Sequence, residues 1–202
     1  HGLQRSGSPT SVRLEWTRKW LEGDFEAIFN SAEFMDTEIF EDDPWWCPRF
    51  YEAINARYPT AKFILLERRP DEWFQSLCRH SRGRNPGESD IHARIYSREE
   101  ELGQTLAANS DLQACAPGLL SIIEHREHYI QTYQRHVAAV RDYFKDMPNQ
   151  LFYARLEDPD VFLRICDFLA VKTDLSLSVP RSNRSTEEMR DQLGNRQVEY
   201  GQ

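Results

Sequence analysis

Arginine side chains stand at the point where an apolar run meets a helical pattern. In KFILLERRPDEWFQS, the run at 62–67 is followed by Arg68 and Arg69, and Pro70 then opens a helix with acidic residues in its first turn. A buried strand of a parallel sheet would deliver these guanidinium groups to the edge where ligands bind, beside the free N–H groups of a helix start. Ser76 adds a hydroxyl donor further along the same helix. The pattern predicts an anion site, and the alternative is a solvated turn in which the arginines pair with Asp71 or Glu72.

A second group of candidate anion ligands lies in the opening segment, HGLQRSGS. It contains two glycines, one arginine and two serines. If a strand ends here, backbone N–H groups could approach a phosphate closely, because glycine leaves room for the approach. The segment lacks the Gly-Lys-Ser/Thr ending of nucleotide-triphosphatase loops. Taken alone, it is also compatible with a flexible N-terminal tail.

The two segments together resemble the sulfotransferases that use 3′-phosphoadenosine 5′-phosphosulfate (PAPS). In that family a loop of the form G-L-x-R-[ST]-G-[ST] holds the 5′-phosphosulfate, and GLQRSGS matches it. A later segment, K-[FIV]-I-L-x-x-R-x-P with Ser eight residues after the Arg, holds the 3′-phosphate, and KFILLERRPDEWFQS matches it. FYEAINARYPTAKF and LFYARLEDPDVFLRICDFLAV are also similar to the family. Beyond the opening loop the resemblance extends over most of 31–183 and is weak between 81 and 117.

The resemblance implies a PAPS donor, a 3′,5′-adenosine bisphosphate product, a small or medium acceptor with a hydroxyl or amine, and no metal ion. It implies that Arg68 and Ser76 bind the 3′-phosphate. Arg5 would bind the phosphosulfate and stabilise charge on the bridging oxygen as the bond to sulfur breaks. The late segment PRSNRS would add Arg181 and Asn183 to the nucleotide site, although a solvated basic turn is equally compatible with it. The implied ligands of the phosphosulfate are Gly2, Leu3, Arg5, Ser6, Gly7 and Ser8.

Sulfuryl transfer also needs a group that accepts the proton of the acceptor. Members of the family commonly use histidine, but no histidine lies between residues 2 and 79, so a carboxylate is expected instead. Asp36 is the candidate base, because it follows a predicted strand end and matches an Asp of the family branch with Arg in the loop. The alternative for Asp36 is an acid that caps a turn or pairs with an arginine. Asp42 and Asp43 compete for the role, although a charged loop is the favoured interpretation of these two residues. Nearby aromatic residues form either an acceptor pocket or, as favoured here, simple core: Phe40, Trp45 and Trp46.

One departure from the family concerns the segment after Ser8. The loop of the family leads directly into a long helix, whereas here PTSVRLEW follows, with Pro9 and no clear TSL continuation. We therefore expect residues to be omitted from the sequence near positions 8–10. We also expect the strand before the loop to begin upstream of residue 1.

Composition indicates a single globular domain over residues 1–202. The chain is 40% hydrophobic and 12% aromatic, with five Trp, which suits a sizeable core and argues against disorder. Its apolar runs are too short to span a membrane, and its net charge of -8 disfavours nucleic acid and anionic membranes as partners. Four cysteines without paired spacing indicate core thiols in a reducing compartment, and hence a cytoplasmic protein.

Periodicity places the candidate residues on alternating strands and helices. The expected elements are, in order, two short helices in 12–29 broken near Gly23, a short strand and loop in 32–40, a helix at 48–58, a strand at 62–67 that is buried on both faces, a helix from Pro70, a loop at 81–90, one long helix at 118–146, a strand at 150–158 and a helix at 159–171. This alternation predicts an α/β fold. With the resemblance, the prediction becomes a three-layer parallel sheet flanked by helices, of the P-loop NTPase-like kind found in sulfotransferases.

Two other functions are open on the sequence. A P-loop kinase-like phosphotransferase is disfavoured by the missing loop lysine and by the lack of an obvious magnesium-binding acid. The second alternative is a non-catalytic module of the same fold that binds a nucleotide or another partner. The segment EHREH places His125 and His128 at helical spacing, but it is not H-E-x-x-H, and an amphipathic helix is favoured over a metal site.

Overall fold

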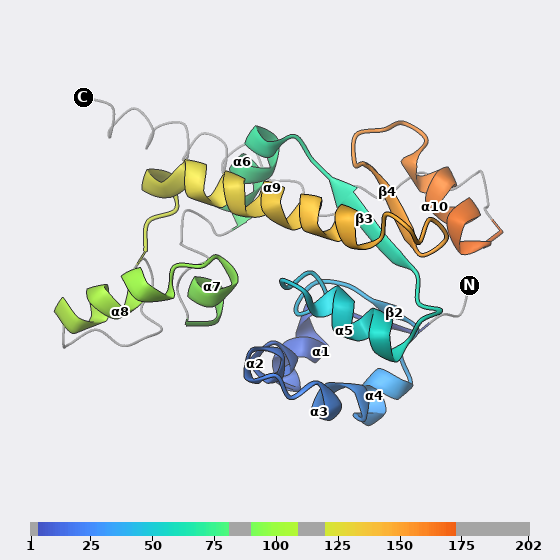
Figure 1. The fold of residues 1–202 in the computed structure, drawn as a ribbon, viewed down its shortest axis with the longest axis horizontal. Coiled ribbons are helices and arrows are strands. Elements are labelled where there is room, and N and C mark those ends of the chain that lie inside the picture. Colours follow the sequence, from blue (N-terminus) through green and yellow to red (C-terminus); the bar gives the residue numbers. More distant parts are fainter. Residues whose placement is uncertain (1–3, 81–89, 109–119, 173–202) are drawn as a thin grey trace. The chain divides into compact units, whose positions relative to one another are not determined.

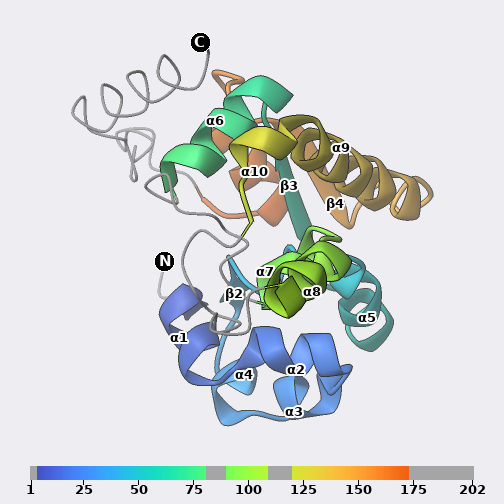
Figure 2. The same ribbon diagram turned by 90° about the vertical axis from the view of Figure 1, so that its left-hand side faces the viewer.

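Helices and short parallel strands together make up the computed structural model, which describes residues 4–80, 90–108 and 120–172 (Figures 1 and 2). This mixture agrees with the expected α/β class. The chain divides into two compact units, 1–61 and 62–202, and each is described on its own. The single domain expected over 1–202 stays a prediction, as do the residues expected to be omitted near 8–10.

The first unit consists of short helices and one pair of strands. Gly23 ends a helix in the left-handed region at φ 75°, so the predicted break is confirmed. Asp24 then accepts the Ala27 N–H at 3.2 Å and begins the next helix. The segment 12–29 thus holds parts of three helices rather than two. The elements are β1 (Arg5–Ser6), α1 (Ser8–Arg13), α2 (Trp16–Glu22), α3 (Phe25–Phe29), α4 (Ala32–Met35), β2 (Ile39–Phe40) and α5 (Phe50–Arg57).

An aromatic cluster forms the core of this unit. Phe40 and Trp45 pack against the cluster, with their ring centroids 4.4 Å apart, and Trp45 lies 5.4 Å from Trp16. The core interpretation of these two aromatic residues is therefore confirmed. The buried members of the cluster are Trp16, Ile28, Phe29, Phe34 and Phe50.

The segment 32–40 differs from its prediction, because a helix comes first and the strand second. Ser31 accepts the Phe34 N–H at 3.3 Å, which begins α4, and Phe34 packs into the aromatic cluster. Asp36 follows as the C-cap residue of α4. The premise that Asp36 follows a strand end is therefore wrong: it precedes β2.

Among the described residues, the second unit has one strand pair, with a helix packed against each of its faces (Figure 1). Two parallel strands run in register from Phe63 opposite Leu151 to Glu67 opposite Arg155. These two strands confirm the predicted ones at 62–67 and 150–158. The elements are β3 (Phe63–Glu67), α6 (Pro70–His80), α7 (Asp90–Ile95), α8 (Glu99–Ala108), the 3₁₀ helix η1 (Ile123–His125), α9 (Arg126–Tyr143), β4 (Leu151–Arg155) and α10 (Val161–Leu169).

Helices α9 and α10 lie on opposite faces of the strand pair. On one face, the guanidinium of Arg141 in α9 lies 4.4 Å from the ring centroid of Tyr153. On the other face, Phe152 packs against Phe168 of α10 at 5.7 Å between centroids. The strands are only partly enclosed, since Ile64 is 43% exposed. Strand β3 is thus half-buried in the described structure rather than buried on both faces as expected.

Helix α6 packs along α9 (Figure 2). Trp73 of α6 stacks on Tyr133 of α9, with ring centroids 4.4 Å apart and planes 10° from parallel. Arg126, the first residue of α9, forms an ion pair with Asp71 and lies 5.7 Å from the ring centroid of Phe74. These contacts hold the start of α6 against the amino-terminal half of α9.

The predicted helix over 118–146 is shorter and interrupted in the structure. Its regular part begins at Arg126, after the 3₁₀ turn η1. The Ser121 carbonyl, which an earlier helix start would use, instead accepts a hydrogen bond from Arg98 at 2.9 Å. A tertiary contact thus lies where the expected helix would begin.

Two further expectations concern the cysteines and the membrane. Cys47 and Cys166 are buried free thiols and Cys78 is half-buried, which agrees with their interpretation as core thiols, while Cys115 lies outside the described residues. Burial raises the pKa of Cys78 to about 11, so this thiol stays protonated near neutral pH.

Of the helices in the described ranges, none combines the length and the apolar character that crossing a membrane requires.

Candidate functional site

The predicted phosphosulfate loop forms a strand, a turn and a helix in direct succession. Arg5 and Ser6 make up β1, Gly7 is the next residue, and α1 starts at Ser8 with Pro9 in its first turn. The N–H groups of Thr10 and Ser11 donate to the Gly7 carbonyl at 3.0 and 3.3 Å. The helix therefore follows the loop at once, as it does in the family, although it is only six residues long.

Strands β1 and β2 are parallel, which brings two chain segments to the same edge. Arg5 pairs with Ile39 and Ser6 with Phe40. The Glu41 N–H continues this pairing by donating to the Ser6 carbonyl at 3.2 Å. Residues that follow β2 therefore lie beside the loop that follows β1, at the carboxyl ends of both strands.

Ser6 and Gly7 have the features of an anion cradle. Ser6 is 2% exposed, and within the described part of the chain its Oγ has no hydrogen-bond partner. Gly7 is in the extended region at φ -133°, which any residue adopts, so its backbone conformation does not require glycine. A Cβ placed on Gly7 would instead lie 3.2 Å from Oε1 of Glu41. A side chain at this position would therefore require the Glu41 carboxylate to move by a few tenths of an ångström, because that carboxylate lies against the loop.

Arg5 already has an anionic partner in this structure. Its guanidinium forms an ion pair with Glu41, and the two side chains are 65% and 49% exposed. Glu41 was not singled out from the sequence. The signal that could have identified it is its position, because the residue directly after a strand parallel to β1 must lie at the edge of the loop.

Arg68 lies directly after β3, as predicted. The Tyr133 hydroxyl accepts the Arg68 N–H at 2.8 Å and donates to the Arg68 carbonyl at 3.1 Å. Burial raises the pKa of Tyr133, so its hydroxyl keeps the proton that it donates. The guanidinium is 36% exposed and makes one long ion pair, Nε to Oε1 of Glu157 at 3.5 Å. The backbone of Arg68 is thus fixed, while its charge stays accessible to a ligand.

The neighbours of Arg68 lie as their sequence position suggests. Arg69 is 67% exposed and pairs with Glu72 at 3.5 Å, so the solvated-turn interpretation holds for this arginine. Ser76 is half-buried in α6, six residues after Pro70 and therefore about 9 Å further along the helix axis. Arg68 and Ser76 belong to one strand-to-helix unit, although no described contact joins their side chains.

The other predicted site residues differ in where they lie relative to the loop. Asp36 is exposed and ends α4, before β2, whereas the loop lies after the strand pair. Asp42 and Asp43 follow β2 and are exposed and half-buried, respectively, and the Asp43 carbonyl accepts the hydroxyl hydrogen of Ser11. The predicted ligands that lie outside the described residues are Gly2, Leu3, Arg181 and Asn183.

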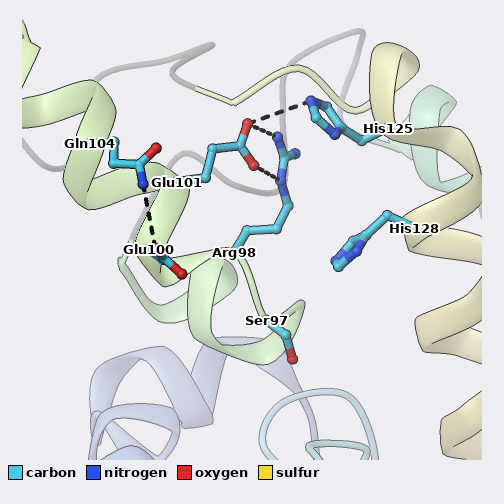
Figure 3. Close-up of a pocket in the computed structure, with 7 residues that line it drawn as sticks. All are labelled: Ser97, Arg98, Glu100, Glu101, Gln104, His125 and His128. Carbon is cyan, nitrogen blue, oxygen red and sulfur yellow. Dashed lines mark hydrogen bonds and ion pairs between the residues drawn. The ribbon is translucent and has the colours of Figure 1, made fainter.

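A polar pocket of about 320 Å³ lies in the second unit, between the start of α8 and the start of α9 (Figure 3). Arg98 is its buried member, with a side chain 2% exposed. Its Nε and Nη2 donate to Glu101 at 2.7 and 2.5 Å, and its Nη1 donates to the Tyr129 hydroxyl at 2.8 Å. The residues that line the pocket are Ser97, Arg98, Glu100, Glu101, Gln104, His125 and His128.

The chemistry of this pocket is that of a structural clamp. Hydrogen bonds from Arg98 hold the pKa of Glu101 below its ordinary value, so the pair is ionised near neutral pH. His125 Nε2 lies 3.5 Å from Glu101, and His128 Nε2 lies 2.7 Å from the Tyr96 carbonyl, which requires a hydrogen on that nitrogen. In residues 4–80, 90–108 and 120–172, no cluster of three or more His, Cys, Asp or Glu is placed to hold a metal ion. The polar groups of Arg98 are used within the protein and leave little for a ligand.

Comparison with known proteins adds one finding. A protein-family model described as a sulfotransferase domain matches residues 15–188. The match includes Arg68, Ser76 and the strand pair of the second unit, and it begins after the loop that contains Arg5. A search of curated proteins found no match.

Proposed function

Because the chain belongs to the sulfotransferase domain family, we propose that it transfers a sulfuryl group from PAPS to a hydroxyl or amine of a small or medium acceptor. The reaction is an in-line displacement: the acceptor oxygen or nitrogen forms a bond to sulfur while the bond from sulfur to the bridging oxygen breaks. The sulfated acceptor and 3′,5′-adenosine bisphosphate are the products, and the acceptor proton passes to a base. The protein must orient both partners and stabilise the charge on the leaving phosphate.

The observation that carries the proposal is the loop after β1. Ser6 has a buried hydroxyl without a described partner, and Arg5 places a cation beside it. An anionic ligand could accept hydrogen bonds from both side chains. These residues fit the phosphosulfate group of PAPS. Arg5 would stabilise the negative charge that develops on the bridging oxygen, which is the role of lysine in many members of the family.

Arg68 and Ser76 are proposed to bind the 3′-phosphate. The accessible guanidinium of Arg68 can form charge-assisted hydrogen bonds to phosphate oxygens. Its ion pair with Glu157 is long and half-exposed, so exchanging that partner for a phosphate costs little. Selectivity for a 3′-phosphorylated nucleotide would follow from this contact. Arg181 and Asn183 stay proposed as further nucleotide ligands.

The base is proposed to be a carboxylate, and its identity can be tested directly. Asp36 is the sequence candidate, but Asp43 follows β2 at the edge of the loop, where a base must lie to reach the acceptor. We expect Asp43→Asn to lower kcat about 100-fold without changing the affinity for 3′,5′-adenosine bisphosphate, since it removes general-base catalysis alone. Asp36→Asn is the matched control and should keep most of the turnover. If Asp36→Asn is the variant that loses turnover, the sequence candidate is the base.

Two other functions stay possible on the same fold. A P-loop kinase-like enzyme would bind ATP in a magnesium-dependent way and would not require a 3′-phosphate. A non-catalytic module would bind the nucleotide but transfer nothing, and it would be insensitive to Asp36→Asn and Asp43→Asn. The family match and the loop geometry favour the sulfotransferase over both.

The proposed donor is tested by calorimetric titration of the protein with 3′,5′-adenosine bisphosphate, 5′-AMP and Mg-ATP. We expect the bisphosphate to bind most tightly and Arg68→Ala to weaken it about 30-fold, because a charge-assisted hydrogen bond to the 3′-phosphate is lost. The same substitution should leave 5′-AMP binding unchanged. Arg69→Ala is the control, since that guanidinium pairs with Glu72 on the exposed turn. Equal affinity of the wild-type protein for 5′-AMP and the bisphosphate would exclude the proposed donor.

A further inference from the structure

Glu41 lies against the loop that the proposed donor would bind. It is close to each of three successive residues of that loop. The Glu41 carboxylate forms an ion pair with Arg5, and the Glu41 N–H donates a hydrogen bond to the Ser6 carbonyl at 3.2 Å. The Oε1 atom of Glu41 would lie only 3.2 Å from a Cβ atom added to Gly7, so the carboxylate lies directly against the loop backbone. A negatively charged group of the protein is thus held against the backbone and the arginine that would hold the phosphosulfate.

We infer that Glu41 is a specificity-determining residue of the loop, one that an incoming anion must displace from Arg5. This inference rests on the proposed function. A carboxylate beside an anion site repels each further negative charge and competes for the same guanidinium. Inorganic sulfate or phosphate, held by the loop alone, binds too weakly to displace it. A nucleotide with further binding groups replaces the carboxylate at small cost, since the ion pair with Arg5 is exposed on both sides.

The backbone of Glu41 supports the strand pair, whereas its side chain supplies the charge beside the loop. The hydrogen bond to the Ser6 carbonyl comes from the backbone, so substitution of the side chain leaves the edge of the strand pair intact. The side chain is 49% exposed, and its described contacts are those with the loop. A change at this position therefore alters the charge at the loop without opening a cavity in the core.

The experiment compares the wild-type protein with Glu41→Gln, which keeps the shape of the side chain and removes its charge. Affinities for inorganic sulfate and for 3′,5′-adenosine bisphosphate are measured by titration calorimetry at constant ionic strength, with chloride as the balancing anion. We expect Glu41→Gln to bind sulfate about tenfold more tightly, as expected for removing one like charge beside an anion near a protein surface. The bisphosphate should gain less, so the preference for nucleotide over sulfate falls.

The control is Glu38→Gln, an exposed acid near the other end of the same strand pair that accepts the Gln4 N–H at 3.4 Å. It should change neither affinity. Equal sulfate affinity of the wild-type protein and Glu41→Gln would overturn the inference, as would an equal gain in Glu38→Gln. If neither the wild-type protein nor any variant binds the bisphosphate, the result counts against the proposed donor and not against the inference. In that case, a gain in sulfate affinity confined to Glu41→Gln would still assign Glu41 to the anion site.

Discussion

Arg5→Ala is expected to lower kcat about a thousandfold while it weakens binding of 3′,5′-adenosine bisphosphate far less. The reason is that the guanidinium is proposed to interact most strongly with the bridging oxygen, whose charge grows only as the bond to sulfur breaks. A contact that strengthens in the transition state appears in kcat more than in affinity. Steady-state turnover with PAPS and a pool of hydroxylated acceptors, together with calorimetry of the bisphosphate, measures both quantities.

Two variants control this prediction. Arg5→Lys keeps the charge, and many members of the family carry lysine in the loop, so it should retain most of the turnover. Arg13→Ala removes another exposed arginine of the same unit, which pairs with Glu33 at 3.1 Å, and it should behave as wild type. If Arg5→Ala lowers affinity and kcat by the same factor, or changes neither, Arg5 does not act on the leaving oxygen.

Glu101→Gln is expected to destabilise the second unit by about 2–4 kcal/mol, which is a large part of the stability of a small domain. The substitution leaves the guanidinium of Arg98, whose side chain is 2% exposed, without its counter-charge. A buried charge that loses its counter-charge costs more than the loss of one hydrogen bond between neutral groups, although the Arg98 hydrogen bonds to Tyr129 and Ser121 remain. Urea-induced unfolding of the wild-type protein and the variant gives the difference directly.

A matched pair in the same chain tests whether burial is the cause. Arg49 and Glu52 form a bidentate pair at the same spacing, with bonds of 3.1 and 3.0 Å, but the Arg49 side chain is 79% exposed. Glu52→Gln should therefore have no clear effect on stability. A similar loss in both variants would show that burial of Arg98 is not what makes its pair important.

The same pair predicts a pH dependence of stability. The folded-state pKa of Glu101 is lowered by hydrogen bonds from Arg98, so the folded protein holds this proton less tightly than the unfolded chain does. Its contribution to stability is complete above the ordinary glutamate pKa of about 4.3 and is lost as pH falls through the lowered value. The advantage of the wild-type protein over Glu101→Gln should shrink accordingly in acid. A difference that stays constant down to pH ~2 would contradict this assignment.

Local signals in the sequence were sufficient to predict several helices and strands. The apolar run before Arg68, the proline that begins α6 and the repeated strand pattern at 150–158 each correspond to an element of the structure. Gly23 likewise ends a helix where expected. These signals act within a few residues of the chain, so a single sequence contains them in full.

Other features depend on contacts that a local pattern does not contain. Helix α4 packs its Phe34 against the rings of Trp45 and Tyr58, which come later in the chain, and Asp36 consequently precedes the strand instead of following it. The start of α9 is delayed by a hydrogen bond from Arg98 to Ser121, which lies 23 residues further along the chain. In both cases tertiary contacts override the local pattern.

The candidate site was predicted only in part, because some of its residues are brought together by tertiary contacts. Arg5, Ser6 and Gly7 lie in a strand-to-helix turn and Arg68 lies at a strand end, as the sequence indicated. Glu41 was missed because its importance arises from the pairing of β1 with β2, and β2 was not recognised as the strand that brings it to the loop. Residue type alone gave no reason to choose this acid among the 33 acidic residues of the chain.

The two hydrogen bonds between the Tyr133 hydroxyl and the Arg68 backbone limit how this protein can be truncated or used in chimeric proteins. Both polar atoms of the Arg68 backbone are held by a single hydroxyl from a residue 65 positions later, and the ring of that tyrosine also stacks on Trp73. The strand-to-helix segment is therefore not a portable module. A fragment that stops before α9, or a chimera that receives the segment alone, would have the proposed phosphate-binding sequence without the support that orients it.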